Sequence, residues 1–355
     1  MTLQKLGVIF GGRSMEHEVS VVSARGVMAQ ADTERFEVVP FGITRNGAWL
    51  TPEETRARLA RVEAGDTRSL GEDEGDGAFA YPEVMALLRQ MDVVFPIVHG
   101  TFGEDGTLQG LLEMADIPYV GSGVAASAVG MDKALMRAVF AAHGVPQTDY
   151  LVLTDEETRA PSSDTIRRIE SELGYPCFVK PANGGSSVGV SRAASREDFG
   201  EALAGAARYD RKVLVEAAIT GREIECAVLG NHDAQGSPLG EIRPTTEFYD
   251  YNAKYLDDSA ELIVPAIVDA AAEARVREMA VRAYRALDCA GLARVDFFVE
   301  PDGGVKCIEV NTLPGFTPIS MYPRLWQEAG LSYRDLISRL VDLAFERFEE
   351  VRSHA

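Results

Sequence analysis

The chain has 355 residues, 46% of them hydrophobic, which allows two or three cores because single domains usually stop near about 250–300 residues. Its 35 basic and 55 acidic residues give a formal net charge of −20, which disfavours non-specific binding to nucleic acid or an anionic membrane. The first apolar run, Leu6–Phe10, is too short for a signal peptide or a membrane span, so we expect a cytoplasmic protein. Four well-separated cysteines without a CxxC pair predict reduced core thiols rather than disulfides or zinc ligands.

The first third of the chain alternates buried strands with helices, which predicts an α/β domain. Lys5–Phe10 and Asp92–Val98 are the strands, and a helix at about Glu16–Gln30 follows the first of them. The second strand leads into His99–Gly106, a glycine-rich turn before another helix, which is a usual ligand position in α/β sheets. Between the strands, Glu63–Ala78 is acidic and aperiodic, which predicts a mobile surface loop.

A glycine- and serine-rich loop, Gly184–Gly189, lies between two predicted strands in the middle of the chain. Its glycines let the backbone approach a ligand, and successive N–H groups in such a turn bind anions, with Lys180 as a charge beside them. The loop is a candidate phosphate site, and a flexible hairpin turn is the alternative. The other predicted elements are a helix at Met131–His143, strands at Cys177–Lys180, Val188–Arg192, Val213–Ile219 and Glu223–Leu229, and helices at Asp269–Leu287 and Ser332–Val351.

Two segments near the carboxyl end predict a β-hairpin. Arg294–Glu300 and Val305–Val310 alternate in polarity and are rich in Val, Ile and Phe. The turn between them contains Asp-Gly, the strongest short hairpin signal. We expect Glu300 to face Val305 and this register to continue along both strands.

One face of this predicted hairpin gathers four polar side chains. In the expected register Asp296 faces Glu309 and Arg294 faces Asn311, all on the same side because side chains alternate along a strand. Two opposed carboxylates repel, but a bound cation would reverse that effect, and Asp, Glu and Asn oxygens suit Mg²⁺. A solvated face with a chance charge pair is the alternative. The other face is expected to be core and carries Val295, Phe297, Val299, Ile308 and Val310.

Two further segments carry weaker signals. Glu247–Tyr255 is aromatic and acidic with one lysine, which predicts an ordered loop that could close over a site; an exposed irregular segment is the alternative. Gly121–Ala126 fits the G-x-G-x-x-A variant of the dinucleotide fingerprint. It lacks the acidic residue expected about 20 residues later, so a turn at a domain boundary is favoured.

Seven motifs follow one another along the chain: GGRSMEHEVS, VFPIVHGTFGEDGTLQG, MDK, FVKPANGGSSVGVS, EFYDYNAKY, ARVDFF and IEVNTLPGFTPISMYP. Their order resembles the D-alanine–D-alanine ligase family, whose members have the ATP-grasp fold. The resemblance runs from about Val8 to the final helix. It implies an α/β architecture of three domains: an N-terminal parallel α/β substrate-binding domain at 1–121, and α+β domains at 122–216 and 217–355 that sandwich ATP.

The resemblance implies an ATP-dependent ligation for peptidoglycan precursor synthesis. The γ-phosphoryl group of ATP passes to the carboxylate of a first D-alanine, a second D-alanine attacks the acyl phosphate, and phosphate leaves from a tetrahedral intermediate. Mg²⁺ is the implied metal, with Mn²⁺ as a substitute, and a homodimer is the implied assembly. The loop before Leu262 contains Tyr255 and no histidine, unlike that of the family's D-alanyl-D-lactate ligases, which favours the dipeptide product.

Residues that match the family's motifs take the roles that the resemblance implies for them. The metal ligands are Asp296, Glu309 and Asn311. The residues implied to bind the phosphates and the nucleotide of ATP are Lys133, Lys180 and Lys254, and the loop over the phosphates contains Gly185, Ser186 and Ser187. Adenine is implied to contact Glu216, Ala218 and Ile219, and the ribose Glu223. The residues implied to bind the first amino acid are Glu16 and His99, and Ser186 and Tyr255 form a polar chain from Glu16 to the closing loop. Arg294 and the backbone at Gly315 are implied to stabilise the oxyanion, and Ser320 and Met321 to lie near the carboxylate of the second amino acid.

Three other functions stay open from the sequence. The first is an ATP-grasp ligase with another acceptor, such as D-lactate. The second is a catalytically silent nucleotide sensor, which the intact Arg294 disfavours because a sensor need not keep an oxyanion-stabilising arginine. The third is a dehydrogenase based on Gly121–Ala126, which would have to bind nicotinamide.

Overall fold

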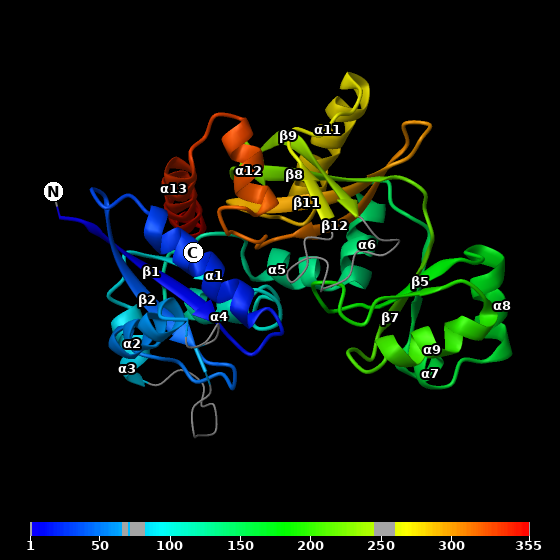
Figure 1. The fold of residues 1–355 in the computed structure, drawn as a ribbon, viewed down its shortest axis with the longest axis horizontal. Coiled ribbons are helices and arrows are strands. Elements are labelled where there is room, and N and C mark those ends of the chain that lie inside the picture. The colour runs from blue at the N-terminus through cyan, green and yellow to red at the C-terminus, as the bar shows by residue number, and fades with distance from the viewer. Residues whose placement is uncertain (1, 66–69, 72–81, 245–259, 355) are drawn as a thin grey trace.

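Three β-sheets form the framework of the computed structural model, which describes residues 2–65, 70–71, 82–244 and 260–354 (Figure 1). The predicted closing loop at Glu247–Tyr255 and most of the predicted loop at Glu63–Ala78 lie outside these residues. No helix in the described parts is long and apolar enough to cross a membrane. All four cysteines are buried and free, which confirms the prediction of core thiols.

The N-terminal sheet is parallel, with the strand order β2-β1-β3. Its predicted strands and first helix are confirmed to within about one residue. Because β1 and β3 are parallel neighbours, the glycine-rich turns that follow them meet at one edge of the sheet. The elements are β1 (Gln4–Gly11), α1 (His17–Gln30), β2 (Phe36–Ile43), α2 (Pro52–Glu63), α3 (Pro82–Leu88), β3 (Val93–Ile97) and α4 (Thr107–Met114).

The second sheet is antiparallel, with the order β4-β7-β5-β6. One predicted strand is wrong in its first half, because β6 begins at Ser191 and not at Val188. Ser186, Ser187 and Gly189 have positive φ angles, so residues 185–190 form turns that cannot continue a ladder. The elements are β4 (Tyr150–Leu153), α7 (Asp155–Arg159), α8 (Ser163–Glu172), β5 (Cys177–Pro181), β6 (Ser191–Ala193), α9 (Arg196–Ala206) and β7 (Val213–Ala217).

The third sheet has the order β10-β9-β8-β11-β12, with α11 packed on one face and α12 on the other. The helices α5 (Val124–Met131) and α6 (Lys133–Ala142) join the core beneath α11. The division of the chain into domains at 121 and 216 stays a prediction. The remaining elements are β8 (Arg222–Leu229), β9 (Gln235–Pro244), β10 (Ala260–Ile263), α11 (Ala270–Ala286), β11 (Leu292–Val299), β12 (Val305–Asn311) and α12 (Met321–Glu328).

The hairpin of β11 and β12 has the predicted register only at the end away from its turn, from Arg294 to Asp296. Asp296 faces Glu309, but a β-bulge follows, so that Val299 and not Glu300 faces Val305. The extra residue of the bulge is Ile308, which has no partner in the register. Its predicted core position is therefore wrong: Cys307 is fully buried instead, and the Ile308 side chain lines a cavity.

The last helix, α13 (Tyr333–Ser353), packs against α1 and β3 of the N-terminal sheet. Its buried residues share one core with that sheet and with α12 and β8. Figure 1 shows the same arrangement, with the red carboxyl-terminal helix beside the blue amino-terminal elements. This common core holds the first and third sheets in a fixed relation to each other.

Candidate functional site

A cavity of about 320 Å³ lies between the second and third sheets. Its walls come from α6, from the glycine- and serine-rich loop, and from the facing strands β5, β7, β8, β11 and β12. Phe178 and Phe298 add flat apolar surface, and the polar groups converge from both sheets, as in a typical ligand pocket. The residues predicted to bind ATP or metal that line it are Lys133, Lys180, Gly185, Ser186, Ser187, Glu216, Ile219, Glu223, Asp296 and Glu309.

The loop Gly184–Gly189 bends sharply over this cavity. Ser186 and Ser187 have φ angles of 50° and 60°, a left-handed conformation that L-residues rarely adopt and that occurs often at functional sites. Lys133, at the start of α6, donates from Nζ to the carbonyl of Gly184 at 2.7 Å. The cation and the loop's backbone are thus held together at the place where an anionic group would lie.

A buried cluster of charges forms the adjoining wall. Glu216 bonds to Arg137 of α6 through one oxygen and to Lys180 Nζ through the other, at 2.7 Å. Burial by itself would raise the pKa of Glu216, but the two adjacent cations outweigh it and lower the pKa. Burial lowers the pKa of Lys180. Arg137 was not predicted from the sequence as a site residue, and its side chain is 1% exposed.

Arg137→Met is expected to lower the free energy of unfolding by about 3 kcal/mol, because removing one partner of a buried charge group leaves the other poorly compensated. Lys180 remains bonded to Glu216, so the loss should lie near the low end of the range for broken buried pairs. Denaturant unfolding measures the change. Arg282→Met on α11 is the matched control: that arginine is exposed beside Glu278, and the change should stay below about 0.5 kcal/mol.

The floor of the cavity is the end of the β11–β12 hairpin away from the turn, where Asp296 and Glu309 face each other. Arg294 binds Asp296 with two parallel hydrogen bonds of 2.8 Å, and its Nε lies 3.1 Å from Glu225 of β8. Asn311 donates to Asp296 at 3.0 Å. Glu309, opposite Asp296, lies 3.3 Å from Lys133 Nζ. The predicted guanidinium and three oxygen-bearing groups therefore do share one face.

This donor set fits a hard divalent cation that also binds a ligand. Two carboxylates and one amide provide three oxygen-bearing groups, and Mg²⁺ usually takes one or two protein carboxylates together with phosphate oxygens. No group of three His, Cys, Asp or Glu side chains in the described residues could hold a metal by itself. A cation at the hairpin would therefore need further ligands besides these protein groups.

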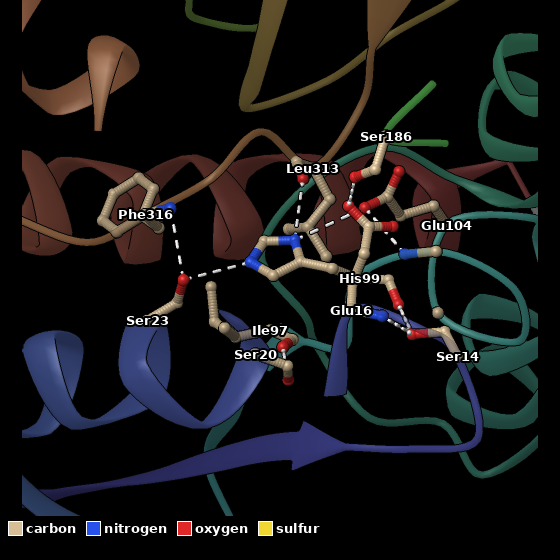
Figure 2. Close-up of polar contacts among 12 residues, drawn as sticks. Ser14, Glu16, Ser20, Ser23, Ile97, His99, Glu104, Ser186, Leu313 and Phe316 are labelled. Atoms are coloured by element: carbon tan, nitrogen blue, oxygen red, sulfur yellow. Dashed lines mark hydrogen bonds and ion pairs between the residues drawn. The ribbon is translucent and has the colours of Figure 1, made fainter. Parts of the chain in front are cut away.

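A second group of residues lies beside the cavity, at the edge of the N-terminal sheet (Figure 2). Ser186 of the glycine- and serine-rich loop donates to Glu16, which precedes α1. A side chain at Gly185 would lie 3.0 Å from the Glu16 carboxylate, so glycine permits this close approach. Ser14 accepts from the N–H of Glu16 and donates to the carbonyl of His99, which ties the turns after β1 and β3 together.

His99 is buried next to Glu16 and bonds on both sides of its ring. Its Nδ1 lies 3.2 Å from the carbonyl of Leu313 and 3.4 Å from Glu104, and its Nε2 lies 3.1 Å from Ser23 (Figure 2). Burial by itself would lower the pKa of His99, but the hydrogen bond and charge of Glu104, with the charge of Glu16, outweigh it and raise the pKa.

The raised pKa of His99 predicts a pH-dependent contribution to stability. A histidine whose folded pKa lies above its unfolded value stabilises the fold fully below about pH 6.5 and loses this effect as pH rises through the folded pKa. The difference in free energy of unfolding between wild type and His99→Gln should therefore shrink between about pH 6 and pH 9. Denaturant unfolding at both pH values tests this. His143→Gln, at an exposed histidine, controls for the loss of an imidazole.

The segment after β12 carries the other predicted substrate residues. A side chain at Gly315 would lie 3.2 Å from Ser320 Oγ, so Ser320 would have to move by a few tenths of an ångström to admit it. Ser320 precedes α12 and accepts from the N–H of Thr317 at 3.0 Å. The Met321 side chain is buried in the core, so only its backbone, at the amino end of α12, remains available to a carboxylate.

Not every predicted residue lies at the cavity. Tyr255 and Lys254 lie outside the described residues, and the exposed Ala218 is not part of the cavity wall, unlike Ala217 and Ile219 on either side. Sequence reasoning also missed three charged residues that contact predicted ones. The sequence held a signal for two of them. Arg137 stands four residues after Lys133 on a predicted helix, and Glu225 stands two residues after Glu223 on a predicted strand, so each shares a face with a predicted residue. The three are Glu104, Arg137 and Glu225.

Comparison with known proteins agrees with this geometry. The family described as D-ala D-ala ligase N-terminus matches residues 5–122, and the family described as D-ala D-ala ligase C-terminus matches residues 139–342. A D-alanine–D-alanine ligase of Acetivibrio thermocellus is 46% identical over 364 residues, which cover 97% of this chain and 96% of that protein.

Solved structures agree as well. The D-alanine–D-alanine ligase of Coxiella burnetii has a TM-score of 0.82 at 34% identity, covering 99% of this chain and 97% of the other. The VanG D-Ala:D-Ser ligase of Enterococcus faecalis has a TM-score of 0.80 at 34% identity, covering 97% and 100%. The Bacillus anthracis D-alanine–D-alanine ligase complexed with ATP has a TM-score of 0.75 at 27% identity, covering 98% and 99%. The chain therefore belongs to the D-alanine–D-alanine ligase family and has its ATP-grasp fold.

Proposed function

We propose that this chain joins two D-alanine molecules to D-alanyl-D-alanine at the expense of ATP, and that the cavity and the Glu16 group are the two halves of its active site. One contact supports this most directly. Ser186, which belongs to the loop over the cavity, bonds to Glu16, 170 residues earlier in the chain. The nucleotide and the first amino acid would therefore meet at a single place.

The roles of the residues follow from their positions. Lys133, Lys180 and the loop's N–H groups would bind the triphosphate, and Glu216 and Glu223 line the end where adenine and ribose would lie. Mg²⁺ held by Asp296, Glu309 and Asn311 would neutralise charge on the phosphates. In this chemistry the first carboxylate attacks the γ-phosphorus, which forms an acyl phosphate and releases ADP.

The second half-reaction needs an anion-stabilising group. The amine of the second D-alanine attacks the acyl carbon, and the negative charge then formed on the oxygen would be stabilised by Arg294 and by the N–H of Gly315. The attack forms the carbon–nitrogen bond, the nitrogen loses a proton, and collapse of the intermediate then breaks the carbon–oxygen bond so that phosphate leaves. Glu16 would hold the ammonium group of the first D-alanine beside His99.

An ADP-release assay tests the proposal. The chain is supplied with ATP and Mg²⁺ and with D-alanine alone, with D-alanine plus D-serine, D-lactate or L-alanine, or with none of these, and products are identified by mass. We expect rapid ADP release with D-alanine and the mass of the dipeptide. A mixed product formed with D-serine, the acceptor named for VanG, or with D-lactate would favour the alternative ligase. Absence of ADP release with every acceptor would refute the ligase assignment.

Assembly and location belong to the same proposal. We propose a homodimer from the family resemblance. We propose a location in the cytoplasm because the substrates, ATP and D-alanine, are soluble molecules. Light scattering of the purified chain measures the assembly. A monomer that retains full turnover would contradict the dimer and leave the ligase proposal intact.

A further inference from the structure

Ser23, on the buried side of α1, lies between His99 and the backbone N–H of Phe316, the residue after Gly315 (Figure 2). Its side chain is 0% exposed. Its Oγ lies 3.1 Å from His99 Nε2 and accepts from the N–H of Phe316 at 3.4 Å. His99 Nδ1 lies 3.2 Å from the carbonyl of Leu313, so a chain of hydrogen bonds joins the helix, the imidazole and this backbone segment.

The chemistry at this position calls for a hydroxyl group. The carbonyl of Leu313 can only accept, so Nδ1 of His99 carries a proton in both charge states of the ring. Nε2 accepts a hydrogen bond in the neutral ring and donates one in the protonated ring. A hydroxyl can donate or accept as required, and its second lone pair can still accept from the N–H of Phe316.

The segment around Gly315 is held from the opposite direction as well. Tyr333 of α13 donates to the carbonyl of Phe316 from within the core. The N–H of Phe316 faces Ser23, and its carbonyl faces Tyr333. Both backbone polar groups of Phe316 are thus bonded, and the N–H that bonds to Ser23 belongs to the peptide that joins Gly315 to Phe316.

We propose that Ser23 is a positioning residue that couples the first-substrate side of the site to the oxyanion side. It acts through two groups: the ring of His99 and the peptide that follows Gly315. The inference rests on the proposed ligase function, because that function makes His99 and Gly315 relevant to catalysis. Ser23 itself lies inside the core and is not part of the cavity wall.

Ser23→Ala tests this by kinetics. We expect kcat for D-alanine-dependent ADP release to fall about 10–100-fold, because small displacements of reacting groups are costly, while KM for ATP stays unchanged. KM for ATP should not move because Ser23 does not border the nucleotide cavity. Ser23→Cys, close in size and a weaker donor, should give an intermediate fall and serves if the alanine variant folds poorly.

Ser20→Ala is the matched control. Ser20 lies one turn earlier on α1, is also 0% exposed, accepts from the N–H of Gly11 at 2.7 Å and donates to the carbonyl of Ile97. It has the same burial and two hydrogen bonds, but no bond to His99. We expect a loss of melting temperature similar to that of Ser23→Ala and a kcat close to that of wild type.

Two further measurements separate coupling from a general loss of structure. Hydrogen exchange should show a faster amide at Phe316 in Ser23→Ala and an unchanged one in Ser20→Ala. In a double-mutant cycle with His99→Gln, the fold-decrease in kcat of the double variant should be smaller than the product of the two single fold-decreases. This is expected because Ser23 acts partly through His99.

The outcomes distinguish the inference from the function on which it rests. If wild type shows no ADP release with D-alanine, the ligase function fails, and exchange at Phe316 alone then decides whether Ser23 holds this segment. If wild type is active and Ser23→Ala is as active, the positioning role is wrong. It is equally wrong if Ser20→Ala and Ser23→Ala lower kcat alike, since both would then act through stability alone.

Discussion

Glu309→Gln is expected to lower D-alanine-dependent phosphate release by about 10³-fold. The substitution keeps the volume of the side chain and removes its charge from the face opposite Asp296. A metal that neutralises developing charge contributes several kcal/mol to transition-state stabilisation, which corresponds to about three powers of ten in rate. Steady-state ADP release with saturating ATP and D-alanine measures the effect.

The control for Glu309→Gln lies on the same hairpin. Glu300→Gln removes the same charge at the turn end, outside the cavity, and should leave kcat within about twofold of wild type because screening by salt weakens the effect of a charge at a distance. Binding of Mn²⁺, followed by electron paramagnetic resonance without turnover, should weaken in Glu309→Gln and not in Glu300→Gln. Near-normal turnover and Mn²⁺ binding in Glu309→Gln would remove this residue from the metal site.

Arg294→Ala is expected to lower kcat by about 10²–10³-fold, the effect of losing one preorganised oxyanion donor. The structure adds a second consequence. Arg294 lies between two buried carboxylates, Asp296 and Glu225, which face each other across β11 and β8. Its removal takes away the guanidinium that both carboxylates contact, so the free energy of unfolding should also fall by about 3–5 kcal/mol.

The catalytic and structural effects of Arg294 can be separated. Adding Glu225→Gln to Arg294→Ala removes one of the two carboxylate charges that the guanidinium contacted and should restore much of the lost stability without restoring kcat. Arg294→Lys keeps the charge but not the two parallel bonds to Asp296, so we expect an intermediate kcat. If kcat of the double variant returned with its stability, or if only KM for ATP changed, the oxyanion role would be refuted.

The hairpin shows how far alternation along a sequence can determine a site. The predicted pairs Arg294–Asn311 and Asp296–Glu309 are present. The pair at the turn from which they were counted is not, because Val299 faces Val305, and the extra residue at the bulge, Ile308, offsets this difference. The bulge has no signal in the residues themselves. A bulge depends on how a strand meets its neighbours and its ligand, and local patterning is blind to both.

The glycine- and serine-rich loop had the same limit. Its composition predicted a backbone that approaches a ligand, but the predicted strand at Val188 is a turn. Positive φ angles at two serines are unfavourable locally, so sequence statistics do not anticipate them. Such conformations persist only where surrounding structure enforces them, as the bonds to Lys133 and Glu16 do here.

From the sequence alone came the α/β class, the strands with their turns, the order of family motifs and the types of residue that carry the chemistry. Each of these depends on neighbours in the chain or on a recognisable run of letters. Only the tertiary structure decided which distant side chains meet: Arg137 with Glu216, Ser186 with Glu16, and Ser23 with His99. Those contacts join residues 76 to 170 positions apart through the packing of separate elements, and no periodicity within one strand or helix encodes such packing.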